Sequence, residues 1–211
     1  MLIYGALISP FVRKVCLVAA EKGLAWELKL TSPGAANPDF VAASPFGKIP
    51  AMTDGNFSLA DSSAIITYIE AAHPAPALLP TEAQARGKAV WFDEFADTIL
   101  AVSGLKILFN RLVSPKFLNI PGDEVLAAQG EAELPRLYAY LEGECATDDW
   151  LVGNAFSLGD IAVASVLRSL EYVAADPRRE AYPAITAWYD RVRARPAWQQ
   201  IAAQEDARIR R

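Results

Sequence analysis

The sequence is poor in the residues that build metal centres and disulfide frameworks. Among its 211 residues there is one histidine, His73, and there are two cysteines, Cys16 and Cys145. A single histidine disfavours a metal site built from histidine ligands, so we expect no metal cofactor. Two cysteines are too few for a disulfide framework, and they fit a protein of a reducing compartment.

Long apolar runs and an excess of positive charge are absent as well. No stretch reaches the roughly 18 consecutive apolar residues of a membrane span. The first residues, Met1–Gly5, lack the basic start of a signal peptide. The 25 acidic residues outnumber the 20 lysines and arginines, which gives a net charge of −5 and disfavours a nucleic-acid surface. We therefore expect a cytoplasmic protein with neither a membrane nor a nucleic acid as partner.

What the chain does have is ample apolar material, divided by a proline-rich segment. Hydrophobic residues make up 53% of the sequence, enough to bury the core of one globular unit or two small domains. Three prolines between Pro74 and Pro80 predict a stiff linker. Strand and helix patterns alternate before it, and only helix patterns follow. These features predict a domain over residues 1–74, a linker over 75–81 and a second domain over 82–211.

The chain before the linker begins with a strand–helix–strand pattern. Residues 2–4 form a short apolar strand, Ser9-Pro10 starts a helix that Gly23 closes, and residues 26–30 form the next strand. Such a unit predicts a right-handed crossover between two parallel strands. On the helix, the apolar positions point inward, so we expect four charged residues to face solvent: Arg13, Lys14, Glu21 and Lys22.

The stretch Phe46–Ala64 continues this domain with a hairpin and a helix start. Pro50 fits the first residue of a strand because it cannot donate to the sheet ladder. Asp54-Gly55 between two apolar runs predicts a hairpin turn, and Asp61-Ser62 precedes a periodic apolar run as helix N-cap residues do. With a short helix over residues 39–43, the order β-α-β-α-β-β-α predicts a thioredoxin-like domain.

Beyond the linker the patterns are helical throughout. We expect helices over residues 82–112, about 123–145 (kinked or divided at Pro135), 182–195 and 196–204. Ser157 and Asp160 have the spacing of a capping box, and Phe156 and Ile161 that of a hydrophobic staple. The helix that follows is apolar almost all round, which predicts a central, buried helix. We therefore assign Asp160 a structural role.

Two of these motifs carry a resemblance. Lys48-Ile49-Pro50, followed by Asp61-Ser62-Ser63-Ala64-Ile65, resembles the glutathione site of the cytosolic glutathione transferases, and the resemblance spans nearly the whole chain. It implies a thioredoxin-like N-terminal domain plus an all-α C-terminal domain. It also implies that the Ile49 backbone, next to Pro50, pairs with the cysteinyl unit of glutathione. Asp61, where the family usually has Glu, and Ser62 would hold the γ-glutamyl end, and Lys48 would contact the glycyl side.

The same resemblance offers Ser9 as the catalytic residue. Ser9-Pro10-Phe11-Val12 is similar to the lead of the serine-type classes (bacterial or tau-, theta- or phi-like), most of all the tau type, in which the serine donates a hydrogen bond to the glutathione thiolate. The alternative is that Ser9 is only a helix N-cap before a proline. Tyr4 is a rival, because other classes use a tyrosine near the end of the first strand. Cys16 falls on the apolar helix face, which predicts a buried, inert thiol.

The resemblance implies a detoxification enzyme that adds the sulfur of glutathione, its co-substrate, to an apolar electrophile. Three alternatives use the same site: glutathione-dependent peroxide reduction, isomerisation and dehalogenation. A non-catalytic binding or assembly module with this architecture also stays open, because a fold does not fix a function. A homodimer is expected, in which Phe46 is either an aromatic clasp into the partner subunit or a residue of the local core.

Overall fold

The computed structural model describes residues 1–209. Contacts within the chain divide it into two compact units. The first contains Met1–Leu78 and the C-terminal segment from Arg195 onward, and the second contains Leu79–Ala194. The sequence-based boundaries place the C-terminal segment in the second domain, whereas its contacts assign it to the first unit. The boundaries at 74, 75–81 and 82 stay predictions.

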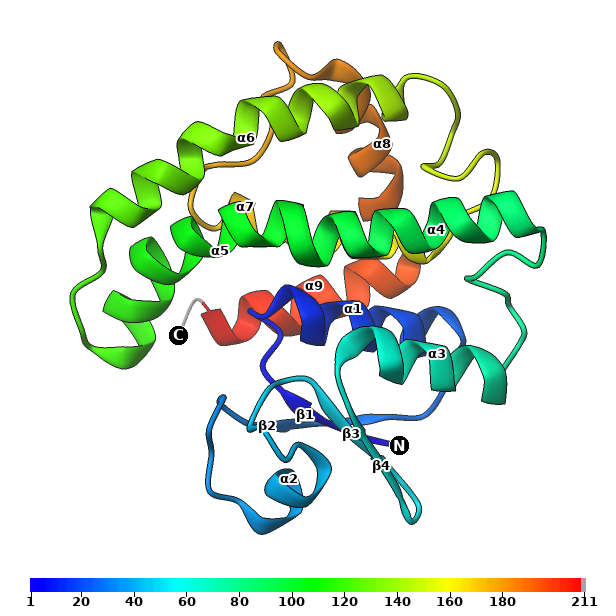
Figure 1. Ribbon diagram of the computed structural model, residues 1–211, viewed down its shortest axis with the longest axis vertical. Coiled ribbons are helices and arrows are strands. Elements are labelled where there is room, and N and C mark those ends of the chain that lie inside the picture. The colour runs from blue at the N-terminus through cyan, green and yellow to red at the C-terminus, as the bar shows by residue number, and fades with distance from the viewer. Residues whose placement is uncertain (210–211) are drawn as a thin grey trace. The chain divides into compact units, whose positions relative to one another are not determined.

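The first unit is built on a four-stranded mixed sheet (Figure 1). Its strands are β1 (Leu2–Gly5), β2 (Glu27–Leu30), β3 (Ala51–Asp54) and β4 (Phe57–Ala60), in the order β2-β1-β3-β4. β1 and β2 are parallel, as the strand–helix–strand pattern predicts, and β3 is antiparallel to both of its neighbours. The strands β3 and β4 form the predicted hairpin, in which Gly55 has a φ of +58°, a value that glycine adopts without strain.

In the described part of the chain, four helices accompany this sheet: α1 (Pro10–Glu21), α2 (Pro38–Ala43), α3 (Ser62–Ala72) and α9 (Pro196–Ile209). α1 contacts both α3 and α9 (Figure 1). Apolar side chains of α1, α3 and the central strands are fully buried and form the core, among them Ile3, Val12, Val15, Met52, Ile65 and Ile66. A smaller cluster joins Tyr4, Phe40, Ala43 and Ala51, with Ile49 packed against it. Strand order and helix order confirm the thioredoxin-like domain.

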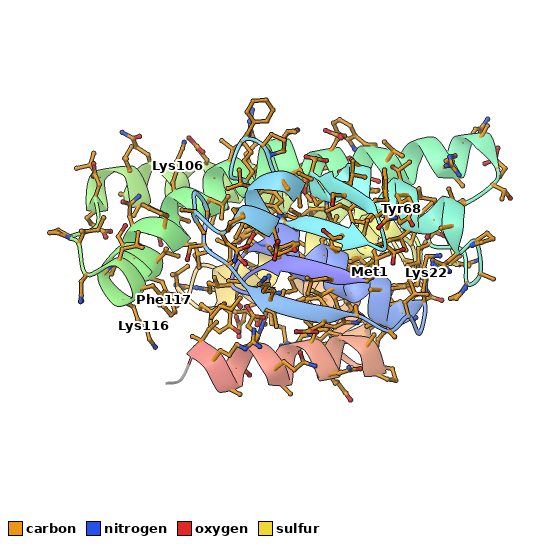
Figure 2. All side chains as sticks on the ribbon, turned by 90° about the horizontal axis from the view of Figure 1, so that it is seen from below. Met1, Lys22, Tyr68, Lys106, Lys116 and Phe117 are labelled. Atoms are coloured by element: carbon orange, nitrogen blue, oxygen red, sulfur yellow. The ribbon has the colours of Figure 1, made fainter. Side chains whose placement is uncertain are left out.

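The expectation that the charged residues of α1 face solvent is wrong for three of them. Arg13 and Lys14 are each 1% exposed and Lys22 is 8% exposed. Nζ of Lys22, which Figure 2 labels, lies 2.8 Å from Glu70 Oε1 and donates to the carbonyl oxygens of His73 and Pro76 at 2.8 and 2.6 Å. The reason is that α1 has helices on two sides, so its polar face packs against protein and its charges find buried partners.

The second unit is helical. Its elements are α4 (Ala83–Phe95), the π-helical segment η1 (Ala96–Leu100), α5 (Ala101–Leu108), the π-helical segment η2 (Phe109–Leu118), α6 (Glu124–Cys145), α7 (Leu158–Glu171) and α8 (Pro183–Arg193). Figure 1 shows α4 and α5 following one another along one path. The predicted helix over 82–112 is thus interrupted by π-helical turns and extends further. α6 contains Pro135 without being divided there.

The capping box at the start of α7 is confirmed. Asp160 is buried and accepts hydrogen bonds from the Ser157 N–H at 2.9 Å and the Ser157 hydroxyl at 3.0 Å. It also accepts from the Leu151 N–H at 2.9 Å and from Trp188 Nε1 at 2.8 Å. Burial raises the pKa of its carboxyl above the usual value, and these four donors oppose that rise. Asp160 therefore joins the start of α7 to the preceding loop and to α8.

No helix within residues 1–209 combines the length and the apolar character needed to cross a membrane.

Candidate functional site

The strand register brings the predicted site segments to one end of the sheet in the first unit. Tyr4 of β1 pairs with Ala51 of β3, and Ala51 pairs in turn with Ala60 of β4. Because each neighbouring strand is antiparallel, the residues just beyond this row (Gly5, Pro50 and Asp61) all lie at the same end of the sheet. The segments that contain Ser9, Ile49-Pro50 and Asp61-Ser62 therefore begin or finish at this end of the sheet, although Ser9 and Ser62 are 53 residues apart in sequence.

Ser9 lies immediately before α1, with a half-buried side chain. Its N–H donates to the Ala6 carbonyl at 2.9 Å, and its own carbonyl accepts from the Arg13 N–H at 3.0 Å. Its hydroxyl makes no capping hydrogen bond to the helix. The Ser9 backbone thus accepts the first hydrogen bond of α1. The hydroxyl does not make the capping bond expected if Ser9 were only a helix N-cap.

Gly5 is needed for this placement, and the sequence analysis did not single it out. It has a φ of +152°, and a Cβ added there would overlap the Val12 side chain of α1. Glycine therefore lets the end of β1 lie directly against the first turn of α1. The signal in the sequence was a glycine between an apolar strand and a helix start, a pattern too common to interpret on its own.

The two rivals of Ser9 lie inside the protein. Tyr4 is buried, with its ring centroid 5.9 Å from that of Phe40 and 5.5 Å from Nζ of Lys29. Cys16 is fully buried, as its position on the apolar face predicts, and burial raises the pKa of its thiol far above the usual value. Both side chains are thus buried, whereas that of Ser9 is half-buried.

The peptide bond between Ile49 and Pro50 is cis. Pro50 is buried directly before β3, whereas Lys48 is exposed. Within residues 1–209, none of the backbone hydrogen bonds of loops and turns involves Ile49. The peptide groups of Ile49 thus lie close to the start of β3, and none of these loop and turn hydrogen bonds uses them.

Asp61 and Ser62 form the start of α3. Asp61 is the N-cap residue, and its Oδ1 accepts from the N–H groups of Ser63 and Ala64 at 3.0 and 3.1 Å. Its φ of +79° with ψ of 131° is a backbone conformation that residues other than glycine rarely adopt, and such residues often cluster at functional sites. Ser62 is buried as the first residue of the helix. The helix N-terminus beside Asp61 favours an anionic group.

A second residue that the sequence analysis left aside is Ser44, which directly follows the short helix predicted over residues 39–43. Ser44 is indeed the C-cap of α2, and its buried hydroxyl bonds to the backbone of Lys48. Serine before proline at a helix end indicates a turn, but it does not indicate which backbone group the hydroxyl contacts.

Comparisons with known proteins agree with this architecture. The family model described as "Glutathione S-transferase, N-terminal domain" matches residues 3–77, and the model described as "Glutathione S-transferase, C-terminal domain" matches residues 103–196. The chain is 34% identical to glutathione S-transferase 3 of Zea mays, over 95% of this chain and 92% of that protein. The chain belongs to the glutathione S-transferase family, and the resemblance seen in its motifs is confirmed.

Two further relatives bear on function. The chain is similar to the structure of glutathione S-transferase-I bound with the ligand lactoylglutathione, with a TM-score of 0.85, 25% identity and coverage of 96% of this chain and 98% of that one. It is also 28% identical to FtsZ-localized protein A of Caulobacter vibrioides, over 93% of this chain and 88% of that protein. The family fold is thus shared with proteins whose names describe different roles.

Proposed function

We propose that this protein is a glutathione transferase that joins the sulfur of glutathione to apolar electrophiles. The observation that supports the proposal is the strand register, which places Gly5, Pro50 and Asp61 at one end of the sheet. The candidate groups in the adjoining segments are the Ser9 hydroxyl, which makes no capping bond to α1, the Ile49 backbone and the start of α3. These groups supply a donor for a thiolate, peptide groups for a peptide ligand and a helix N-terminus for a carboxylate.

In this proposal Ser9 is the catalytic residue. A cysteine thiol titrates near pH 8.5, so making its thiolate the major form at neutral pH requires a pKa about two units lower, or about 2.7 kcal/mol. A hydrogen bond to a charged acceptor contributes roughly 1.5–3 kcal/mol, and a helix N-terminus adds roughly 0.3–1 kcal/mol. The Ser9 hydroxyl at the start of α1 is therefore sufficient, and the thiolate itself attacks the electrophile.

The rest of the site holds the tripeptide. The Ile49 N–H and carbonyl pair with the cysteinyl backbone, beside Pro50. Asp61 and Ser62, at the start of α3, hold the γ-glutamyl end, because the α-amino group suits the Asp61 carboxylate and the α-carboxylate suits the helix N-terminus. Lys48 is exposed and contacts the glycyl carboxylate. No metal is required by any of these roles.

The proposal is tested by combining calorimetry of glutathione binding with an electrophile screen. The expected result is binding of glutathione, followed by formation of thioether products whose mass equals glutathione plus the electrophile, less any leaving group. Hydroperoxide, isomerisation and haloalkane substrates in the same screen separate the three alternative reactions, because each forms a different product from the same bound thiolate.

The similarity to FtsZ-localized protein A favours a second candidate, a binding or assembly module without catalysis. The two candidates differ in turnover. A catalytic member binds glutathione, lowers its thiol pKa and forms product, whereas a module that lost the reaction shows no turnover with any electrophile in the screen. The Ser9 hydroxyl, which makes no capping hydrogen bond to α1, supports the catalytic candidate.

We also propose a homodimer in the cytoplasm. Phe46 is 91% exposed, in the loop before Lys48. An aromatic ring exposed to this degree does not belong to the core of its own chain, which leaves the clasp as the interpretation of Phe46. Two-fold symmetry would give each copy the same contact.

A further inference from the structure

We propose that Ser44 is the positioning residue of the glutathione site, the group that fixes the loop from which Ile49 presents its backbone. This inference rests on the proposed function, because it assigns a role in binding the tripeptide. Ser44 touches neither the thiol nor the electrophile in this account. It acts through the peptide groups of Lys48, its neighbour in the loop between α2 and β3.

The hydroxyl of Ser44 makes two hydrogen bonds to a single residue. It accepts from the Lys48 N–H at 2.9 Å and donates to the Lys48 carbonyl at 2.7 Å. A serine hydroxyl has one proton and two lone pairs, so one oxygen can do both. The side chain is 1% exposed, which makes both bonds costly to lose without a replacement. The backbone of Lys48 is therefore held on both sides of its Cα.

The backbone of Ser44 extends this support to α2. Its N–H donates to the Phe40 carbonyl at 2.7 Å, and its carbonyl accepts from the Gly47 N–H at 2.9 Å. Phe40 is fully buried against Tyr4 and Ala51, which pair with each other near the end of the sheet where the site segments meet it. Ser44 thus connects the rigid core of the first unit to the loop, with each of its polar groups in use.

A second contact fixes the other side of the loop. The Gly34 N–H donates to the Gly47 carbonyl at 2.8 Å, and Gly47 has a φ of +64°. A Cβ at Gly47 would approach the Gly34 Cα at 3.2 Å, closer than most real Cβ contacts. The loop is therefore held against residue 34 by glycine and against α2 by Ser44.

This arrangement leaves the peptide groups of Ile49 available to a ligand. The Lys48 N–H and carbonyl are satisfied within the loop, while no loop or turn backbone bond within residues 1–209 involves Ile49. A ligand that pairs with Ile49 gains most when the loop is already ordered, because ordering a backbone on binding costs affinity. Removal of the Ser44 hydroxyl should therefore weaken glutathione binding and leave the chemistry at Ser9 unchanged.

The test compares Ser44→Ala with two variants. Ser44→Thr keeps the hydroxyl, and Ser58→Ala removes a hydroxyl that bonds Thr53 Oγ1 at 3.1 Å in the β3–β4 hairpin of the same unit. Three quantities are measured for each: the glutathione Kd by calorimetry, the pKa of the bound thiol by its thiolate absorbance, and kcat at saturating glutathione. We expect Ser44→Ala to raise Kd about tenfold, the size of one net hydrogen bond, with the thiol pKa and kcat unchanged. Ser44→Thr and Ser58→Ala should bind like the wild type.

An unchanged Kd in Ser44→Ala, or an equal loss in Ser44→Thr, overturns the assignment. If Ser44→Ala does not fold, amide exchange of the wild-type protein decides. The Lys48 N–H should exchange slowly and the Ile49 N–H quickly, and Ile49 should become protected when glutathione binds. Fast exchange at Lys48, or no change at Ile49 on binding, contradicts the inference. Failure of the proposed function is seen separately, as a wild-type protein that binds no glutathione at all.

Discussion

Arg13 of α1 and Glu205 of α9 form an ion pair in which each side chain is only 1% exposed. Nε of Arg13 lies 3.0 Å from Glu205 Oε2, and a second guanidinium nitrogen donates to Oε1, so the pair is bidentate. Arg195 and Glu21 make a similar paired contact, with both distances at 2.7 Å. These contacts explain why the last helix belongs to the first unit, and they join α9 to the helix that Ser9 starts.

Breaking the buried pair should cost far more stability than breaking an exposed one. Glu205→Ala removes the bidentate carboxylate from the buried Arg13 charge, so we expect the free energy of unfolding to fall by about 3–5 kcal/mol. Asp190→Ala, which removes the partner of Arg179 in an exposed pair, should change it little. Urea denaturation of both variants gives the comparison. Equal losses in the two would show that the buried pair is not the special contact described here.

The fold of the first unit was predictable because its signals are local and agree with one another. Alternating strand and helix patterns, the Asp54-Gly55 turn and the helix starts at Ser9 and Asp61 each specify a few residues, and together they predict the order of the elements along the chain. The burial of Arg13, Lys14 and Lys22 was not predictable, because the periodicity of one helix does not reveal how many neighbours it has. Their partners are more than 45 residues away in sequence.

The buried thiol of Cys145 predicts a loss of stability at alkaline pH. Burial raises its pKa to about 12, above the usual value near 9. A pKa raised by folding gives stability that is fully present below the unfolded value and lost as the pH rises toward the folded one. Between pH 9 and 10.5 this one group should therefore lower the unfolding free energy by roughly 1 kcal/mol per pH unit.

The variant Cys145→Ala tests this through a slope. Unfolding free energies of the wild type and the variant are measured across that pH range, and the variant's decline should be shallower by the stated amount. The cavity left by the substitution shifts both ends of the curve equally, so it does not affect the comparison. Parallel curves would mean that the thiol ionises in the folded protein as it does in the unfolded one.

Asp61 has a role in the helix and a proposed role in the ligand site, and two substitutions separate them. Asp61→Ala loses the cap on Ser63 and Ala64 and should lower stability by about 0.5–2 kcal/mol. Asp61→Asn keeps a capping oxygen and removes only the charge. If the carboxylate holds the γ-glutamyl amino group, both variants should weaken glutathione binding in calorimetry. Normal affinity in Asp61→Asn would restrict Asp61 to its capping role.

The exposed ring of Phe46 predicts a self-associating protein. Sedimentation at micromolar concentration should give about twice the chain mass of 22.9 kDa. Phe46→Ser should shift the equilibrium toward the monomer, because it removes the apolar surface that the partner would bury. Phe57→Ser, at another exposed phenylalanine of the same unit, is the matched control and should stay dimeric. A wild-type protein that sediments as a monomer would contradict the proposed assembly.

The site was only partly readable from the sequence. Ser9, Ile49-Pro50 and Asp61-Ser62 could be proposed because each stands at an element boundary with its own local signal and matches a motif of the family. Gly5 and Ser44 were not, because their importance depends on what lies opposite them, the Val12 side chain and the Lys48 peptide groups. Contacts of this kind follow from the packing of α1 and the course of one loop, which periodicity and caps do not determine.

The central claim is that the Ser9 hydroxyl stabilises the glutathione thiolate, and one titration tests it directly. Thiolate absorbance of bound glutathione is followed against pH in the wild type and in Ser9→Ala. Because the hydroxyl makes no cap bond, we expect glutathione affinity and protein stability to change little. The pKa of the bound thiol should rise by about one to two units, since each unit corresponds to about 1.36 kcal/mol. An identical titration in the two proteins would contradict the account and leave Ser9 as a residue that only begins a helix.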